Sequence, residues 1–446
     1  MTLNKYPCVR RYPYILVITL CIMFFGAFQS AHSQSFDSIE RQRTLDMLKT
    51  VKADLKKNYY DPSFHGMDLD ARFNAAEEKL KKAASIGQAF SIIAQVLLDL
   101  DDSHTKFYPP SRPEKIDYGW KMQMIGDASY IVAVRPGSDA DKQGLKPGDR
   151  VLAVERRKPT RKDLWKMNYY YNVLSPRPGL QVAVQSPGGE PRELNLEAKI
   201  THGQRVVDLT SDIGINAFLR ELEDDRLEDR DRYYENVDGV FVWKMRRFYL
   251  TDSQIDTMMG RVKKSKALVL DLRDNGGGAE DTLLRLLGHF FDKDVKMADI
   301  KSRKESKAII AKTRGNDPFK GKVVVLIDSN SGSAAEIFAR IMQLEKRGTV
   351  IGDRSAGAVM RSMAHPYEMG VNTVVFYGAS MTVADVLMSD GQSLEHVGVI
   401  PDELLLPSPE DLAARKDPVL ARALELAGAK VDAAKAGALF PFEWKK

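Results

Sequence analysis

Apolar residues recur every three to four positions over residues 39–100, a spacing that predicts amphipathic helices. The positions that share a face are Leu45, Leu48, Val51 and Leu55 in one stretch, and Leu69, Phe73, Ala76 and Leu80 in the next. Asp61 and Pro62 separate these two helices, and residues 85–88, SIGQ, have the form of a capping box that begins a third. We therefore predict an N-terminal helical domain over residues 34–112, which contains the polar segment 101–105, DDSHT.

The apolar period changes to two between residues 115 and 200, as in strands that bury one face. Alternating runs lie at 130–134, 151–154 and 180–184, with a turn signal at 144–149 and a helical stretch at 162–174. This pattern predicts a small β-rich domain over residues 113–200. The charged residues that follow, up to 238, are interpreted as a linker or hinge.

From residue 239 the pattern alternates between short apolar runs and helical periods. Apolar runs at 267–272 and 323–327 each lead into a turn rich in glycine and serine and then into a helix, and a further run lies at 349–352. Repeated strand–turn–helix units predict an α/β core. We assign this core to residues 239–430 and a C-terminal tail to 431–446, so that the whole chain is a multidomain α/β protein.

The first residues have the pattern of a secretory signal peptide. Lys5, Arg10 and Arg11 precede an apolar run at 14–28, and Ala31-His32-Ser33 offers a small-x-small cleavage site. The alternative is an uncleaved anchor, but the run is short against the ~20 residues of a spanning helix. We predict a leader over residues 1–33, export to the periplasm or envelope of a bacterium, and no stable membrane span after its removal.

Composition narrows the chemistry further. Both cysteines, Cys8 and Cys21, lie in the leader, so the mature protein has neither disulfides nor cysteine-based catalysis or zinc sites. The 66 basic and 61 acidic residues nearly balance over 446 residues. A nucleic-acid partner would need basic residues clustered on one face, and the sequence has no such footprint.

Ser333 is the first candidate for chemistry, because it lies where an apolar strand gives way to a helix. The free N–H groups and the positive end of the helix dipole at such a place favour a developing oxyanion. The alternatives are an N-cap serine without a catalytic role, and Ser331 as the nucleophile of the same turn. The glycines at 276–278 permit close approach of the backbone, as in a tight turn or a phosphate cradle, but the nucleotide-binding glycine motifs are missing.

A nucleophilic serine needs a base, and two histidines have a suitable context. His104 lies in the polar segment 101–105, and His396 adjoins Glu395 shortly before residues 398–402, GVIPD. An imidazole with the ordinary pKa of about 6.5 beside a carboxylate predicts a rise of activity between about pH 6 and 7.5.

Four segments in this order resemble the tail-specific, or C-terminal processing, serine peptidases: 270–278 (LDLRDNGGG), 331–339 (SGSAAEIFA), 351–357 (IGDRSAG) and 398–402 (GVIPD). The resemblance extends from about residue 40 to 427. It implies a peptidase core of the ClpP/crotonase-like kind, a PDZ-like domain at 113–200, polypeptide substrates, and neither metal nor organic cofactor. The oligomeric state is not implied.

One departure from this family decides the catalytic set. Its best-known members use a Ser–Lys dyad, and the position of that lysine holds Ala358 here. A branch that resembles the tricorn core peptidase uses a Ser-His pair instead, which Ser103 and His104 match, with Glu395 as the carboxylate of the set.

The resemblance then implies Ser333 as nucleophile, His104 as base, and Ser103 with Glu395 as its orienting groups. It implies an oxyanion hole from the N–H groups of Gly277 and Ala334. It also implies a peptide-binding loop in the PDZ-like domain at Gly119, Trp120, Lys121 and Met122. The alternative functions are a catalytically inactive binding protein with the same fold and a PDZ scaffold.

Overall fold

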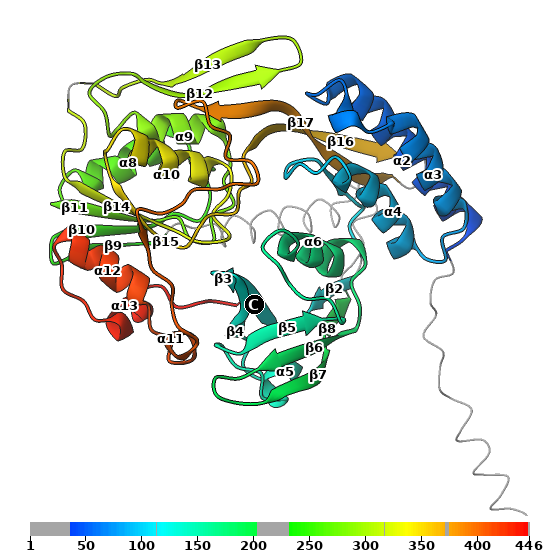
Figure 1. Cartoon of the computed structure of the whole chain (residues 1–446), viewed down its shortest axis with the longest axis horizontal. Helices are drawn as coiled ribbons and strands as arrows, with labels where there is room; N and C mark the ends of the chain where they lie inside the picture. The colour runs from blue at the N-terminus through cyan, green and yellow to red at the C-terminus, as the bar shows by residue number, and fades with distance from the viewer. Residues whose placement is uncertain (1–35, 113, 203–231, 316, 371–373, 445–446) are drawn as a thin grey trace, which may run out of the picture.

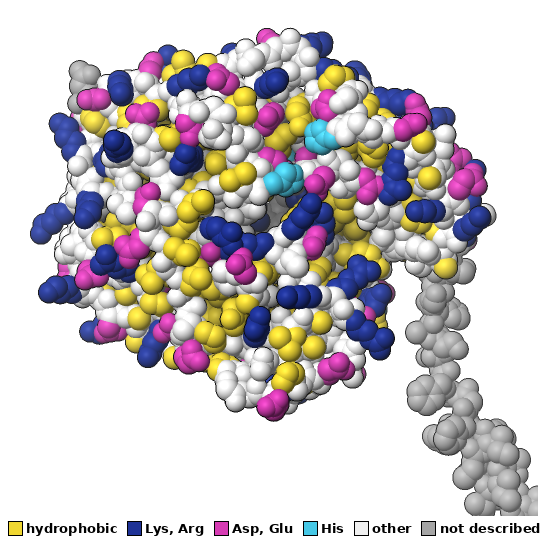
Figure 2. Space-filling model, viewed as in Figure 1, with side chains coloured by type: hydrophobic (Ala, Val, Ile, Leu, Met, Phe, Trp, Pro, Cys, Tyr) yellow, Lys and Arg dark blue, Asp and Glu magenta, His cyan; other side chains and the backbone are white. Residues whose placement is uncertain are grey.

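The computed structural model describes residues 36–112, 114–202, 232–315, 317–370 and 374–444 (Figure 1 and Figure 2). The predicted leader and most of the predicted linker lie outside these ranges. Within them the protein is a mixed α/β structure with helices at its N-terminal end and several sheets (Figure 1).

A six-stranded sheet forms the centre of the C-terminal half, in the order β18 (Glu403–Leu404), β15 (Thr349–Gly352), β14 (Lys322–Ile327), β11 (Ala267–Asp271), β10 (Val240–Lys244) and β9 (Arg232–Val237). All neighbours are parallel except β9 and β10. Every residue of β11 is buried, as expected of a parallel strand that is covered on both faces.

Helices cover both faces of this sheet (Figure 1). One apolar core joins it to α8 (Asp252–Val262), α9 (Glu280–Leu287) and α10 (Ala334–Leu344). A second core, on the other face, joins it to α12 (Pro418–Ala427) and α13 (Ala433–Leu439). Strand β9 comes from the predicted linker and helix α13 from the predicted tail, and both belong to this layered unit.

The N-terminal helices α2 (Ser38–Asn58), α3 (Leu69–Lys81) and α4 (Ile86–Leu98) share one apolar cluster with residues from later in the chain. They pack on one half of the long strand β17 (Val375–Met388), where Tyr377, Ala379 and Met381 join their apolar cluster, while the other half of β17 belongs to the core of the central sheet. The short strand β1 (Lys106–Tyr108) pairs antiparallel with β17. This pairing fixes the segment 101–105 against the C-terminal half of the chain.

The other partners of β17 are β16 (Met360–Met369) and β12 (Val295–Ser302), which pairs in turn with β13 (Ser306–Ala311).

The β-rich part, here called the middle module, comprises residues 114–202. Five antiparallel strands run in the order β3 (Trp120–Ile125), β4 (Ala128–Val134), β5 (Arg150–Val154), β6 (Gly179–Gln185) and β7 (Pro191–Glu197). The pair β2 (Glu114–Asp117) and β8 (Lys199–His202) lies beside them, with the helices α5 (Asp139–Lys142) and α6 (Leu164–Tyr169). Strand β3 is an edge strand of its sheet, and it faces the central sheet.

Candidate active site

Ser333 lies immediately before α10 in a backbone conformation with φ 53° and ψ −118°. A positive φ is uncommon for any residue but glycine and is a form of strain that concentrates at active sites. The Ser333 N–H donates to the carbonyl of Ala358 at 2.9 Å and to Oε2 of the buried Glu336 at 3.0 Å. Glycine is required at 277, where a Cβ would lie 2.6 Å from that of Ser333.

The rival serine of the same turn has a structural role. Ser331 is fully buried, and its Oγ donates to the carbonyl of Leu272 at 2.8 Å while it accepts the N–H of Asp328 at 2.9 Å. This hydroxyl is therefore occupied by the turn itself, whereas Ser333 is half-buried and faces a histidine.

Four side chains form one chain of hydrogen bonds that ends at Ser333. Glu395 accepts the Ser103 hydroxyl at 2.8 Å and the Ser103 N–H at 2.7 Å. Ser103 Oγ lies 2.7 Å from Nδ1 of His104, and Nε2 of His104 lies 3.4 Å from Oγ of Ser333. The last distance is long, as catalytic hydrogen bonds often are before substrate binds.

The direction of these bonds determines the tautomer of His104. An ionised carboxylate only accepts hydrogen bonds. The Ser103 hydroxyl therefore donates a hydrogen bond to Glu395 and accepts one from the Nδ1–H of His104. Nε2 then carries a lone pair directed toward the Ser333 hydroxyl, which is the arrangement that a general base needs. The rival His396 is half-exposed, and its Nε2 contacts the carbonyl of Asp101 at 2.7 Å instead.

Asp102 supports His104 and was missed by the sequence analysis. Its Oδ1 accepts the N–H groups of His104 and Thr105 at 2.9 and 2.7 Å and the Thr382 hydroxyl at 2.6 Å, while its Oδ2 accepts the hydroxyl of Tyr59 at 2.9 Å. A local signal exists, because an aspartate often accepts the N–H two residues on in an Asx-turn.

Electrostatics lowers the basicity of His104. Burial is the main cause, and the neighbouring ammonium of Lys106 adds to it, so that the pKa of His104 falls to about 4 although Asp102 opposes the change. The predicted limb between about pH 6 and 7.5 is therefore wrong for the imidazole, because the sequence does not reveal its burial. Burial also raises the pKa of Glu395, although hydrogen bonds from the Ser103 hydroxyl and from the N–H groups of Ser103 and Val359 oppose this change. Burial raises the pKa of Glu336 to about 7.

We expect two limbs in a profile of kcat/KM against pH, one near pH 7 from Glu336 and one near pH 4 from His104. Protonated Glu336 loses acceptor capacity for the Ser333 N–H, and protonated His104 cannot act as a base. Glu395→Gln removes a negative charge and should move the lower limb to lower pH, whereas Lys106→Met removes a positive charge and should move it to higher pH. A lower limb that moves in neither variant contradicts its assignment to His104.

The predicted oxyanion hole is half supported by the geometry. The N–H of Ala334 opens α10 and donates to none of the described residues, so it is available to a substrate oxygen. The N–H of Gly277, the other predicted donor, is paired with Oδ1 of Asn275 at 2.8 Å. Gly276 and Gly278 donate to no acceptor in the described part of the chain, so the glycine turn offers these N–H groups instead.

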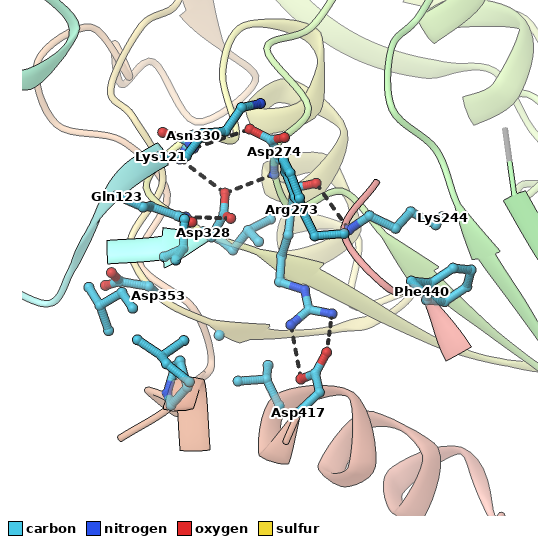
Figure 3. Close-up of a pocket in the computed structure, with 18 of the residues that line it drawn as sticks. Lys121, Gln123, Lys244, Arg273, Asp274, Asp328, Asn330, Asp353, Asp417 and Phe440 are labelled. Atoms are coloured by element: carbon cyan, nitrogen blue, oxygen red, sulfur yellow. Dashed lines mark hydrogen bonds and ion pairs between the residues drawn. The ribbon is translucent and has the colours of Figure 1, made fainter. Parts of the chain in front are cut away.

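The predicted peptide-binding loop lies in the middle module and does not join Ser333. The Gly119 N–H donates to Asp117, and the Trp120 side chain is buried in the core of the module. Lys121 Nζ lies 4.9 Å from the ring centroid of Phe442, near the C-terminal end. Lys121 and Met122 line a cavity of about 340 Å³ between β3, the ends of the central strands and the C-terminal residues (Figure 3).

This cavity adjoins the turn at residues 328–333, which ends at the nucleophile candidate Ser333. Figure 3 shows Gln123 of β3 bonded to Asp328, and the measured distance between Nε2 and Oδ2 is 2.7 Å. Ser329 donates to the carbonyl of Met124 at 2.6 Å. The middle module therefore contacts the turn that ends at Ser333, although neither Ser333 nor His104 lines the cavity.

In the part of the chain that the structure describes, His, Cys, Asp and Glu side chains form no group of three or more that could hold a metal ion.

The chain is similar to a known family of peptidases. Residues 240–405 match the model of Peptidase family S41. The tail-specific protease of Haemophilus influenzae is 25% identical over 313 residues, which are 65% of this chain and 41% of that protein. The carboxy-terminal processing protease CtpA of Bacillus subtilis is 22% identical over 318 residues, 69% of this chain and 62% of that one. The chain thus spans less than two thirds of these two relatives.

Among solved structures, mature CPAF has a similar fold, with a TM-score of 0.60 and 14% identity over 84% of this chain and 95% of that one. These matches confirm the resemblance to the tail-specific peptidases that the four sequence segments indicate. The class of protein to which this chain is similar is the serine-type peptidases.

Proposed function

We propose that this protein is an exported serine endopeptidase of the C-terminal processing kind, with Ser333 as nucleophile and His104 as general base. The observation that carries the proposal is the continuous chain of hydrogen bonds from Glu395 through Ser103 and His104 to Ser333. Glu395, Ser103 and His104 form a relay that ends at the hydroxyl of Ser333, which lies at the strained start of α10.

The reaction follows from the directions of these bonds. Ser333 Oγ attacks the peptide carbonyl carbon as its proton passes to Nε2 of His104, and the N–H of Ala334 stabilises the oxyanion. His104 then gives the proton to the leaving amine, which leaves an acyl ester on Ser333. A water molecule that loses a proton to His104 hydrolyses this ester. Glu395, acting through Ser103, keeps Nδ1 protonated throughout and stabilises the imidazolium.

The general test is mass spectrometry of unfolded proteins incubated with the purified protein. We expect internal peptide bonds to be cut by the wild type and left intact by Ser333→Ala. Labelling of Ser333 by a serine-directed covalent probe would accompany cleavage. A protein that neither cuts nor reacts would instead be a catalytically inactive binding protein on a peptidase fold.

Glu395→Gln should lower kcat by about 10- to 100-fold, which is less than loss of the nucleophile. The amide keeps an acceptor for Ser103 but loses the charge that favours the imidazolium. The matched control is Glu368→Gln, an acid on β16 that belongs to none of the bonds described above. Unchanged activity of Glu395→Gln would remove this residue from the catalytic set.

We further propose that the middle module is a PDZ-like domain that engages the extended substrate. Its strand β3 is at the edge of its sheet, and an edge strand can accept a peptide by strand addition. The contacts of Gln123 and Met124 with residues 328–329 support a path from this edge toward the nucleophile. Peptide binding to the Ser333→Ala protein, weakened by a proline at position 123, would support this role.

The leader supports a proposal of export. Residues 1–33 combine a basic start, an apolar run and a small-x-small end. No helix in the described ranges is long and apolar enough to cross a membrane. N-terminal sequencing of protein recovered from the cell envelope should begin close to Gln34, and a sequence that began at Met1 would contradict removal of the leader.

A further inference from the structure

Lys106 is a partly buried cation beside the catalytic histidine that the proposed mechanism does not use. It is the first residue of β1, two positions after His104. Its ammonium is near enough to the imidazole to lower the pKa of His104, and its own pKa is lowered by burial. An ammonium in a partly desolvated position that makes the neighbouring base less basic needs a reason.

The only contact that the structure records for this ammonium, among the described residues, is with an aromatic face. Nζ lies 4.5 Å from the ring centroid of Trp165, on helix α6 of the middle module. A cation over an indole ring is stabilised by the ring's electron density, but its three N–H donors remain without an anionic acceptor.

The nearby carboxylates do not supply that acceptor. Asp102 already accepts from four donors and Glu395 from three. Both favour the charged form of Lys106 through space, yet neither forms an ion pair with it in the described part of the chain. An anionic acceptor for the Lys106 ammonium must therefore come from a group other than Asp102 and Glu395.

The position of Lys106 indicates which side of a substrate it meets. In the proposed mechanism His104 delivers a proton to the leaving amine, so the groups around His104 face the part of the substrate that departs. Lys106 follows His104 by two residues. Its neighbour Phe107 is buried in the apolar cluster of the N-terminal helices, so the Lys106 side chain lies on the opposite side of β1, over Trp165 of α6.

We propose that Lys106 and Trp165 form a carboxylate-binding subsite for the leaving-group side of the substrate. The preferred substrates would then carry a negative charge just after the scissile bond. This charge is either an acidic side chain or the free carboxylate of a short C-terminal fragment. The inference rests on the proposed function and adds its substrate class.

The experiment begins with a peptide that mass spectrometry shows to be cut by the wild type. Two pairs of derivatives are compared by kcat/KM. One pair has glutamate or glutamine directly after the scissile bond, in a long peptide with an amidated end. The other pair has a neutral side chain there and ends one or two residues later with either a free carboxylate or an amide.

We expect the charged member of at least one pair to be cut about 10-fold faster or more, as for a hydrogen-bonded ion pair in a partly desolvated site. A preference in the first pair identifies a side-chain carboxylate, and one in the second identifies the chain end. In Lys106→Met the preference should fall to within about 2-fold, while Lys106→Arg should keep part of it.

Lys166→Met is the matched control. Lys166 also lies near the Trp165 ring, at 5.6 Å, but it is close to carboxylates of Asp101 and Asp163, so its loss should leave the preference intact. If the wild type cuts both members of each pair equally well, the proposed carboxylate subsite is wrong, but the proposed peptidase function still stands. This comparison needs no variant. Absence of any cleavage would instead overturn the proposed function. An unchanged preference in Lys106→Met, or its loss in Lys166→Met, would also overturn the subsite.

Discussion

Ser333→Ala is expected to lower kcat by about 10³-fold or more while the protein stays folded and still binds polypeptide. Among the described residues, the Ser333 hydroxyl faces Nε2 of His104 and takes part in a capping box with Glu336, so its removal takes away the nucleophile and one N-cap contact. The backbone conformation at 333 is held by Ala358 and Glu336, which the substitution does not change. Steady-state kinetics on a peptide that the wild type cuts would measure the effect, with thermal unfolding as the check on folding.

Ser331→Ala tests whether Ser331, and not Ser333, is the nucleophile. Its hydroxyl joins Leu272 and Asp328 inside the turn, so its loss should destabilise the fold by about 1–3 kcal/mol, as for an unsatisfied buried group. We expect its effect on kcat to be much smaller than that of Ser333→Ala. The reverse order of the two effects on kcat would assign the nucleophile to Ser331.

His104→Ala is expected to lower kcat by a similar factor, about 10³-fold, because no other described side chain is placed to accept the Ser333 proton. Nε2 of His104 is directed at Ser333 at 3.4 Å, and Ser103 with Glu395 fixes the tautomer. His396→Ala is the matched control, since that imidazole contacts the carbonyl of Asp101 instead. Activity within about 10-fold of wild type in His104→Ala would make the assignment wrong.

Many helices and strands could be predicted from the sequence, because the apolar patterns that mark them are local. The helical period between residues 39 and 100 corresponds to α2, α3 and α4, and the apolar runs at 267–272 and 323–327 to β11 and β14. Two elements in the predicted linker and tail had no such local signal. Strand β9 and helix α13 are held by contacts with the central sheet, and their own residues carry no strong periodicity.

The sequence by itself determined the chemical groups and their immediate surroundings. A serine at a strand-to-helix turn, a Ser-His pair after a helix and an alanine in place of a dyad lysine are all properties of neighbouring residues. Their types favour a serine nucleophile with a histidine base.

Only the tertiary structure decided how these groups meet. Ser333 and His104 are 229 residues apart and Ser103 and Glu395 are 292 apart, and strand β17 brings them together through its pairing with β1. The same packing buries His104 beside Lys106 and directs the Gly277 N–H to Asn275. Basicity and hydrogen-bond direction depend on what surrounds a group in space, and that environment is assembled from parts of the chain that no local pattern connects.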